Sequence, residues 1–148
     1  MCGFIGVFDK NGGLRNYASG IIEAGQLLYH RGMDDEGSYF DDHAGFYFRR
    51  LSIIELSEKG RQPFISDDGA LVLVYNGEIY NYKELRTMLD EKGHRFVSSS
   101  DTEVLMKTYQ EFGDECVNYL RGMFAFAIWN KKLMELTLFR DRFGIKPL

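Results

Sequence analysis

The hydrophobic positions in the first half of the chain predict one helix between short strands. Apolar side chains recur at helical spacing from Ala18 to Tyr29, which predicts an amphipathic helix that ends at Gly32. Short apolar runs bounded by turn residues lie on both sides of it. They predict strands over residues 2–8, 37–40, 44–54 and 71–75.

The second half of the chain predicts two helices followed by a hairpin. Each helix has a start signal of the capping-box type and a glycine at its end, and their ranges are residues 81–93 and 100–113. The apolar runs 124–129 and 133–139 flank a short polar turn, which is typical of an antiparallel hairpin. Antiparallel strands with helices between them indicate the α+β class, with sheets layered against helices.

Composition limits the range of functions. The chain has 148 residues, of which 45% are hydrophobic, so it has the length of one domain and can bury a core. With a net charge of −4 and no block of Lys and Arg, it is not expected to bind nucleic acid. No apolar stretch approaches the roughly 18 residues of a membrane span and no signal sequence is recognisable, so we expect a cytoplasmic protein without a membrane partner.

The few cysteines and histidines argue against a metal site. The two cysteines, Cys2 and Cys116, are far apart in the sequence, and His30, His43 and His94 are scattered. Metal sites usually combine such ligands at short spacing. We therefore predict no metal, a reduced compartment, and an inert core thiol at Cys116.

Cys2 directly follows the initiator methionine. If Met1 is removed, this one residue carries a thiol nucleophile together with a free α-amine that can accept the thiol proton, as in enzymes with an N-terminal threonine. The same cysteine could instead be a small hydrophobic residue at the start of a buried strand.

Four other segments combine polar side chains in short spans: residues 30–32, 49–54, 76–78 and 100–103. Several have a purely structural explanation. Residues 30–32 could end a helix with Gly32 in the left-handed conformation. Asn76 and Gly77 could form a plain hairpin turn, and Asp101 could simply belong to a helix N-terminus.

The same segments could also serve catalysis. An Asn amide and a Gly N–H at a strand end, such as Asn76 and Gly77, are two donors that can stabilise an oxyanion. Arg50 lies in an apolar run and is expected to meet a carboxylate of the protein or of a ligand. Glu78 and Asp101 could hold an ammonium group. With a terminal cysteine, these groups could bind an amino acid and attack its side-chain carbonyl.

Seven motifs make a resemblance specific. They are M-C-G-F-I-G, H-R-G-M-D-D-E-G, R-L-S-I-I-E, N-G-E-I-Y-N, S-D-T-E, M-F-A-F-A-I-W and R-D-R-F-G-I-K-P-L. In this order they resemble the glutaminase domain of glutamine-hydrolysing asparagine synthetases, which belong to the class II, N-terminal-nucleophile amidotransferases. The resemblance extends from Cys2 to Leu148.

The resemblance implies roles for individual residues. Cys2 would be the nucleophile, Asn76 and Gly77 would form the oxyanion hole, and Arg31 and Gly32 would support the nucleophile. Arg50 would bind the α-carboxylate of glutamine with the help of backbone groups of the next four residues, while Glu78 and Asp101 would hold the α-ammonium. The substrate-binding residues implied are Arg50, Leu51, Ser52, Ile53, Ile54, Asn76, Gly77, Glu78 and Asp101.

The resemblance also implies the fold and the reaction. The fold would be an αββα sandwich of two antiparallel sheets flanked by helices, with Cys2 at the mouth of the cleft between the sheets. Residues 1–148 would be a partial type 2 glutamine amidotransferase domain, truncated at its C-terminus. It would hydrolyse L-glutamine to glutamate and ammonia through a thioester, for ATP-dependent asparagine synthesis from aspartate.

No cofactor is expected in this domain, because ATP and Mg would act only in a C-terminal synthetase domain that this chain lacks. That domain would be the partner in the full-length protein, and the resemblance also allows a homodimer. Two alternatives remain open. The same glutaminase half could serve another acceptor, such as a sugar carboxylate in polysaccharide synthesis, or the domain could bind its ligand without turnover.

Overall fold

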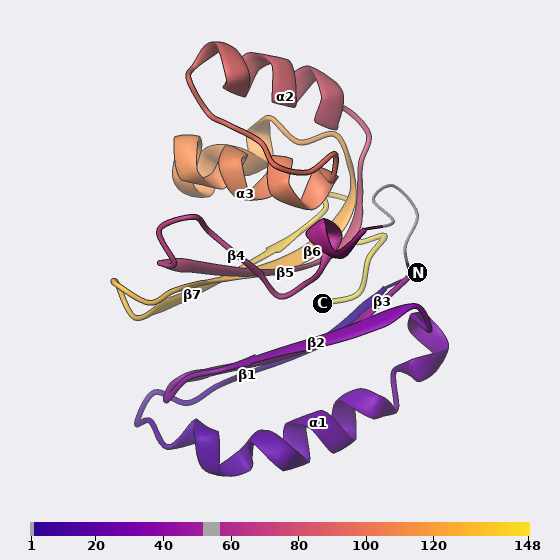
Figure 1. Ribbon diagram of the computed structural model, residues 1–148, viewed down its shortest axis with the longest axis vertical. Coiled ribbons are helices and arrows are strands. Elements are labelled where there is room, and N and C mark those ends of the chain that lie inside the picture. Colours follow the sequence, from indigo (N-terminus) through magenta and orange to yellow (C-terminus); the bar gives the residue numbers. More distant parts are fainter. Residues whose placement is uncertain (1, 52–56) are drawn as a thin grey trace.

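The computed structural model describes residues 2–51 and 57–148, and it has four layers. In Figure 1, helix α1 (Ala18–Gln26) covers a first sheet, a second sheet packs on that one, and helices α2 (Tyr82–Glu91) and α3 (Asp101–Phe112) cover the far side. This arrangement confirms the predicted α+β class and the αββα sandwich.

The first sheet places the start of the chain beside the end of its central strand. It consists of β1 (Gly3–Phe8), β2 (Asp35–Phe40) and β3 (Ala44–Arg50), in the order β1-β3-β2. All pairs are antiparallel, and the register pairs Gly3 with Arg49. Cys2, which precedes β1, is therefore brought close to the residues that follow β3.

The second sheet shows that Asn76 and Gly77 do not form a turn. Its strands are β4 (Phe64–Ile65), β5 (Leu71–Ile79), β6 (Gly122–Asn130) and β7 (Glu135–Arg140), in that order. Asn76 pairs with Ala125 and Gly77 with Phe124, so β5 runs past the predicted strand end to Ile79. The turn interpretation is wrong because both residues keep extended pairing with β6.

Gly77 has a tertiary reason to be glycine. A Cβ atom at this position would lie 2.2 Å from the Met123 carbonyl oxygen and 2.7 Å from Phe124 Cα. Contacts this short with backbone atoms would push β6 away. The glycine therefore permits a close approach between two strands, which a local turn signal cannot reveal.

The other predicted boundaries were partly correct. The predicted first helix divides into α1 and a short 3-10 helix, Tyr29–Arg31, and Gly32 is extended with φ −163°, so the left-handed helix end is wrong. The strand predicted over residues 44–54 is β3, which ends at Arg50, whereas residues 52–56 lie outside the described residues. Further 3-10 helices span Leu14–Tyr17, Glu58–Gly60 and Gly113–Asn118.

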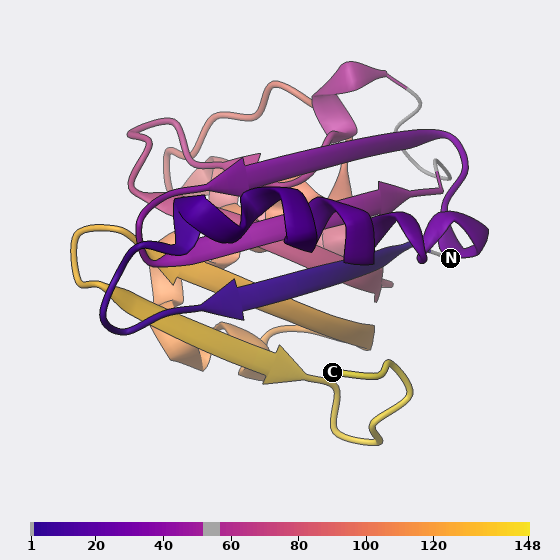
Figure 2. The ribbon, with the colours of Figure 1, turned by 90° about the horizontal axis from the view of Figure 1, so that it is seen from below.

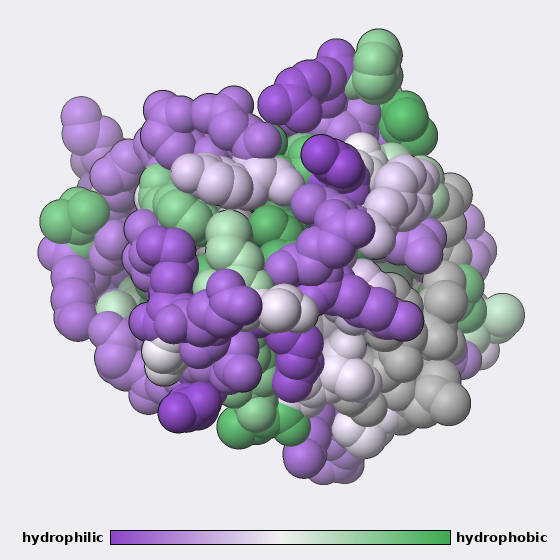
Figure 3. Space-filling model, turned by 90° about the horizontal axis from the view of Figure 1, so that it is seen from above, coloured by the Kyte–Doolittle hydropathy of each residue, from purple (hydrophilic) through white to green (hydrophobic). Residues whose placement is uncertain are grey.

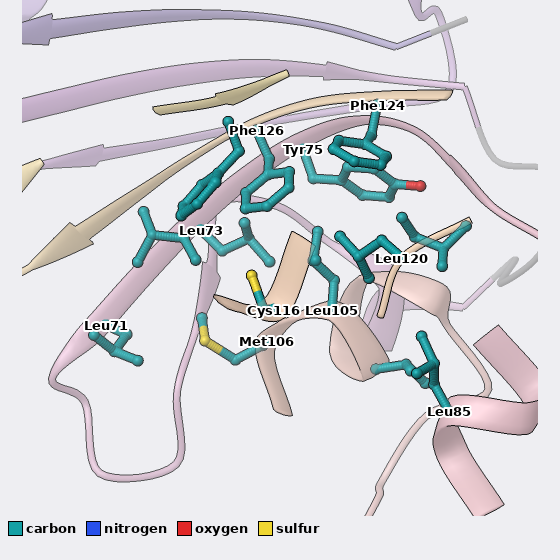
Figure 4. Packing of buried hydrophobic residues seen from close by; sticks show 14 of the residues in the cluster. Leu71, Leu73, Tyr75, Leu85, Leu105, Met106, Cys116, Leu120, Phe124 and Phe126 are labelled. Carbon is teal, nitrogen blue, oxygen red and sulfur yellow. The ribbon is translucent and has the colours of Figure 1, made fainter. Parts of the chain in front are cut away.

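Within the described ranges, three groups of buried side chains hold the layers together. One fills the space between the sheets and consists of Ala44, Phe46, Phe48, Val72, Val74, Ala127 and Trp129. The second packs β5 and β6 against α2 and α3, as Figure 4 shows for Leu73, Leu105, Phe126 and their neighbours. Polar side chains dominate the outer face above α2 (Figure 3), which buries only one side, whereas α3 is buried all round over residues 101–108 because it lies between α2 and the second sheet.

The third group attaches α1 to the first sheet, along which the helix lies in Figure 2. It contains Leu14, Ile21 and Tyr47. Gly25 makes the approach possible, because a Cβ atom there would lie 2.1 Å from the ring of Tyr47. Gly20, in the same helix, is exposed, and a Cβ atom there would meet no atom within 4 Å apart from its chain neighbours and the backbone of its own helix.

These two glycines form a matched pair for a stability measurement. We expect Gly25→Ala to lower the free energy of unfolding by about 1–3 kcal/mol, because the added methyl overpacks the α1 interface. Gly20→Ala should raise it by about 0.5–1 kcal/mol, because alanine loses less backbone entropy in a helix. Urea unfolding measures both. Equal effects of the two substitutions would contradict the packing of α1 on Tyr47.

Candidate active site

Cys2 lies half-buried at the start of β1, against the residue that follows β3. The Leu51 N–H donates a hydrogen bond to Cys2 Sγ at 3.3 Å, and Sγ is 3.6 Å from the Leu51 carbonyl oxygen. The thiol is therefore fixed beside the segment that contains Arg50. Met1, Ser52, Ile53 and Ile54 lie outside the described residues.

Arg31 contacts the backbone of Cys2, and Gly32 follows Arg31 in the chain. Arg31 Nη2 donates to the Cys2 carbonyl oxygen at 3.3 Å. Gly32 lies against the end of β3, where a Cβ atom would approach the Arg50 carbonyl carbon to 2.5 Å. Arg49 Nε donates a hydrogen bond to the Gly32 carbonyl oxygen at 2.9 Å. Because a larger residue at position 32 would not fit, glycine keeps this loop close to Cys2.

Asn76 faces the region around Arg31 and Gly3 from the second sheet. It follows Val72 and Val74 in the strand alternation of β5, so its side chain points toward the first sheet, and it is buried. A cavity of about 710 Å³ between the sheets is lined by Asn76, Arg31, Gly3 and Phe4 among others. The structure thus brings the candidate amide donor and the residues around Cys2 to one cavity.

The Gly77 N–H points away from β6. β4 is short and pairs only with Leu73 and Val72, so beyond them the opposite edge of β5 is met by side chains. Gln62 Oε1 accepts the Tyr75 N–H at 2.6 Å, and Asp101 Oδ2 accepts the Ile79 N–H at 3.2 Å. N–H groups of alternate residues point to the same edge. The Gly77 N–H therefore points to this edge, between those two bonds.

Asp101 is a buried carboxylate at the first residue of α3. Its Oδ2 accepts the Tyr75 hydroxyl at 2.8 Å as well as the Ile79 N–H. Burial raises the pKa of Asp101, while those two hydrogen bonds lower it, and the charge of Glu78 raises it. The pKa of Tyr75 is raised by burial and by the charges of Asp101, Glu78 and Cys2. These groups thus share one electrostatic environment.

The neighbours of Asp101 in the motif S-D-T-E, which spans residues 100–103, explain how Asp101 is held in place. Ser100 Oγ accepts the Thr102 N–H at 3.0 Å, so the predicted N-cap of α3 is correct. Glu103 does not complete a capping box, because its carboxylate accepts the N–H groups of Val97 and Ser98 instead. The bond from Ser100 caps α3, and those to Glu103 fix the loop that leads into it.

Arg50 and Glu78 complete the set of predicted residues. Arg50 is buried at the end of β3, and its Nη1 donates to the Ser57 carbonyl oxygen at 3.0 Å, an acceptor that the sequence did not indicate. Glu78 is half-buried on β5, two residues after Asn76 and therefore on the same face. Arg50 thus comes from the first sheet and Glu78 from the second.

Sequence reasoning missed the supporting residues Gln62, Tyr75 and Arg49. Gln62 lies in a loop and Tyr75 inside an apolar strand run, so neither carries a local signal. Arg49 contacts Gly32, pairs with Glu36 and lies 4.9 Å from the centre of the Tyr29 ring. Its position in an apolar run was the same signal that singled out Arg50.

Among residues 2–51 and 57–148, no three His, Cys, Asp or Glu side chains are grouped so that they could hold a metal ion. Over the same ranges, no helix is long and apolar enough to cross a membrane.

Comparisons with known proteins identify the family of the chain. A family model described as "Glutamine amidotransferase domain" matches residues 1–148. The chain is 49% identical over its whole length to asparagine synthetase [glutamine-hydrolyzing] 1 of Bacillus subtilis, and it covers 24% of that protein. It is 38% identical to asparagine synthetase B [glutamine-hydrolyzing] of Escherichia coli and covers 26% of it.

A solved structure shares the fold. The glutamine phosphoribosylpyrophosphate amidotransferase of B. subtilis, complexed with ADP and GMP, matches with a TM-score of 0.58 and 28% identity. The match covers 70% of this chain and 24% of that chain. The chain therefore spans about a quarter of the length of these relatives.

The two cysteines should differ sharply in reactivity. Cys116 is fully buried, and burial raises the pKa of its thiol to about 12, whereas Cys2 is half-buried. The thiolate is the reactive form. We expect iodoacetamide at pH 7.5 to add one group to the native protein, at Cys2, and a second only in denaturant. Peptide mass spectrometry locates the adducts, and native labelling of Cys116 would contradict the buried position.

Proposed function

The chain belongs to the glutamine amidotransferase domain family, and on that premise we propose that it hydrolyses L-glutamine to glutamate and ammonia with Cys2 as the nucleophile. The observation that carries the proposal is that four residues, Cys2, Arg31, Asn76 and Gly77, come together where the two sheets meet. Arg31, which donates a hydrogen bond to the Cys2 carbonyl oxygen, and Asn76 line the same cavity between the sheets, and the N–H of Gly77 points to the edge of β5 opposite β6.

The proposed reaction begins once Met1 has been removed. The free α-amine of Cys2 accepts the thiol proton, and Sγ attacks the side-chain carbonyl carbon of glutamine. The carbonyl oxygen becomes an oxyanion, which the Asn76 amide and the Gly77 N–H stabilise. The intermediate collapses when the amide nitrogen takes the proton and leaves as ammonia. Water then hydrolyses the γ-glutamyl thioester, which releases glutamate and restores the thiol.

Charged side chains would bind the two α-groups of the substrate. Arg50 suits the α-carboxylate, because a guanidinium can form two parallel hydrogen bonds with it, and Leu51, Ser52, Ile53 and Ile54 would add backbone groups. Glu78 and Asp101 would bind the α-ammonium. The burial of Asp101 supports this assignment, since a buried carboxylate gains most from a cationic partner.

The names of the relatives suggest where the ammonia goes. Both asparagine synthetases described above are glutamine-hydrolysing, and the chain matches about a quarter of each. We infer that in the whole protein a synthetase domain uses ATP and Mg to convert aspartate to asparagine, whereas this domain uses no cofactor. A cytoplasmic location and a homodimer stay predictions. No observation favours a sugar acceptor or a domain that binds without turnover.

Removing the Cys2 thiol should abolish the reaction. We expect Cys2→Ala and Cys2→Ser to release no glutamate from glutamine, because neither offers a thiol to form the thioester. Cys116→Ala is the matched control and should retain activity, since Cys116 lies in the core. An enzyme-coupled glutamate assay measures all three. Turnover by either Cys2 variant would refute the assignment of the nucleophile.

Removing one oxyanion donor should affect the rate more than binding. We expect Asn76→Ala to lower kcat for glutamine hydrolysis roughly 100- to 1,000-fold, the usual loss for one such donor. KM should change far less, because the donor acts on charge that develops only in the transition state. Steady-state kinetics separates the two. A rise in KM with kcat unchanged would assign Asn76 to ground-state binding instead.

A further inference from the structure

Tyr75 is buried beside Asp101, although it belongs to none of the groups proposed to touch glutamine. Its hydroxyl donates to Asp101 Oδ2 at 2.8 Å, and the Ile79 N–H reaches the same oxygen at 3.2 Å. Two donors from β5 on one oxygen hold the plane of the carboxylate in one orientation. The ring itself lies beside Phe124 at the margin of the apolar cluster (Figure 4).

Gly77 allows the tyrosine to reach Asp101. Tyr75, Gly77 and Ile79 alternate on the α3 side of β5. A Cβ atom at position 77 would lie 2.8 Å from Tyr75 Cε2, so the ring extends along the strand over the glycine. A side chain there would displace the ring and its hydroxyl from the carboxylate.

Gln62 fixes the backbone on which Tyr75 stands. Its side chain accepts the Tyr75 N–H at 2.6 Å and donates to the Tyr75 carbonyl oxygen at 3.1 Å. The same Nε2 lies 3.4 Å from Thr102 Oγ1, in the first turn of α3. One buried amide therefore links the strand that carries Tyr75 to the helix that carries Asp101.

We propose that Tyr75 is the positioning residue of the substrate-ammonium site, where its hydroxyl and the Ile79 N–H hold Asp101 Oδ2 so that Oδ1 meets the α-ammonium of glutamine. This inference rests on the proposed glutaminase function. A hydroxyl suits the task, because it restrains the carboxylate without neutralising the charge that binds the ammonium. A cation in its place would compete with the substrate.

The test compares Tyr75→Phe with Tyr39→Phe. Tyr39 also donates its hydroxyl to an aspartate, Asp41 Oδ2 at 2.6 Å, but it lies in β2 near the turn that leads to β3. The register places that turn at the Phe8 end of β1, away from Cys2. Each substitution removes one tyrosine–aspartate hydrogen bond, which is buried for Tyr75 and partly buried for Tyr39. The control therefore reproduces the structural loss without touching Asp101.

We expect Tyr75→Phe to raise KM for glutamine about tenfold and to leave kcat within about twofold, as the loss of one hydrogen bond to a charged group predicts. Tyr39→Phe should change neither. In an Asp101→Asn background, Tyr75→Phe should add nothing further, because the tyrosine acts through the carboxylate. An unchanged KM in Tyr75→Phe, or a further loss in the Asp101→Asn background, would overturn the inference.

Glutaramate, which is glutamine without its α-amine, supplies an independent measurement. As substrate or competitive inhibitor it should interact with wild type and Tyr75→Phe equally, since it has no ammonium for Asp101 to bind. A tenfold loss with glutaramate as well would overturn the positioning role while leaving the glutaminase intact. If wild type releases no glutamate from glutamine, the proposed function fails, and this inference fails with it.

Discussion

The edge of β5 beyond the short β4 is the constraint on which the site depends. Buried backbone N–H groups must find acceptors, and β4 pairs only with Leu73 and Val72. Side chains satisfy the positions that follow, Gln62 at Tyr75 and Asp101 at Ile79. The Gly77 N–H points to the same edge between them. Among residues 2–51 and 57–148, no strand pairs with this end of β5, which thus becomes a row of donors in which the middle one is suited to an oxyanion.

The two sheets contribute different parts of the chemistry. Cys2 is held by residues that adjoin the first sheet, Leu51 directly after β3 and Arg31 in the 3-10 helix before β2, and the second sheet supplies Asn76 and the edge of β5. Because the apolar side chains between the sheets fix their separation, the core sets the distance between Cys2 and the proposed oxyanion donors. The core thereby determines the geometry of the proposed reaction as well as the stability of the fold.

Much of the fold was predictable from local patterns, whereas the site required tertiary information. The hairpin of β6 and β7 and the N-cap at Ser100 follow from periodicity and capping chemistry. Asn76-Gly77 carries the strongest local turn signal, yet both residues pair with β6. Glycine is needed at position 77 because β6 approaches β5 closely there, and not because the chain turns. Gln62 and Tyr75 carry no local signal, since their roles arise only when distant segments meet.

The most direct test of an N-terminal cysteine that recognises glutamine is intact-mass analysis after treatment with the electrophilic glutamine analogue 6-diazo-5-oxo-L-norleucine. We expect a chain without Met1 that gains a single adduct on Cys2, with L-glutamine slowing the labelling. A chain that retains Met1, an adduct on Cys116, or labelling that glutamine does not slow would contradict it.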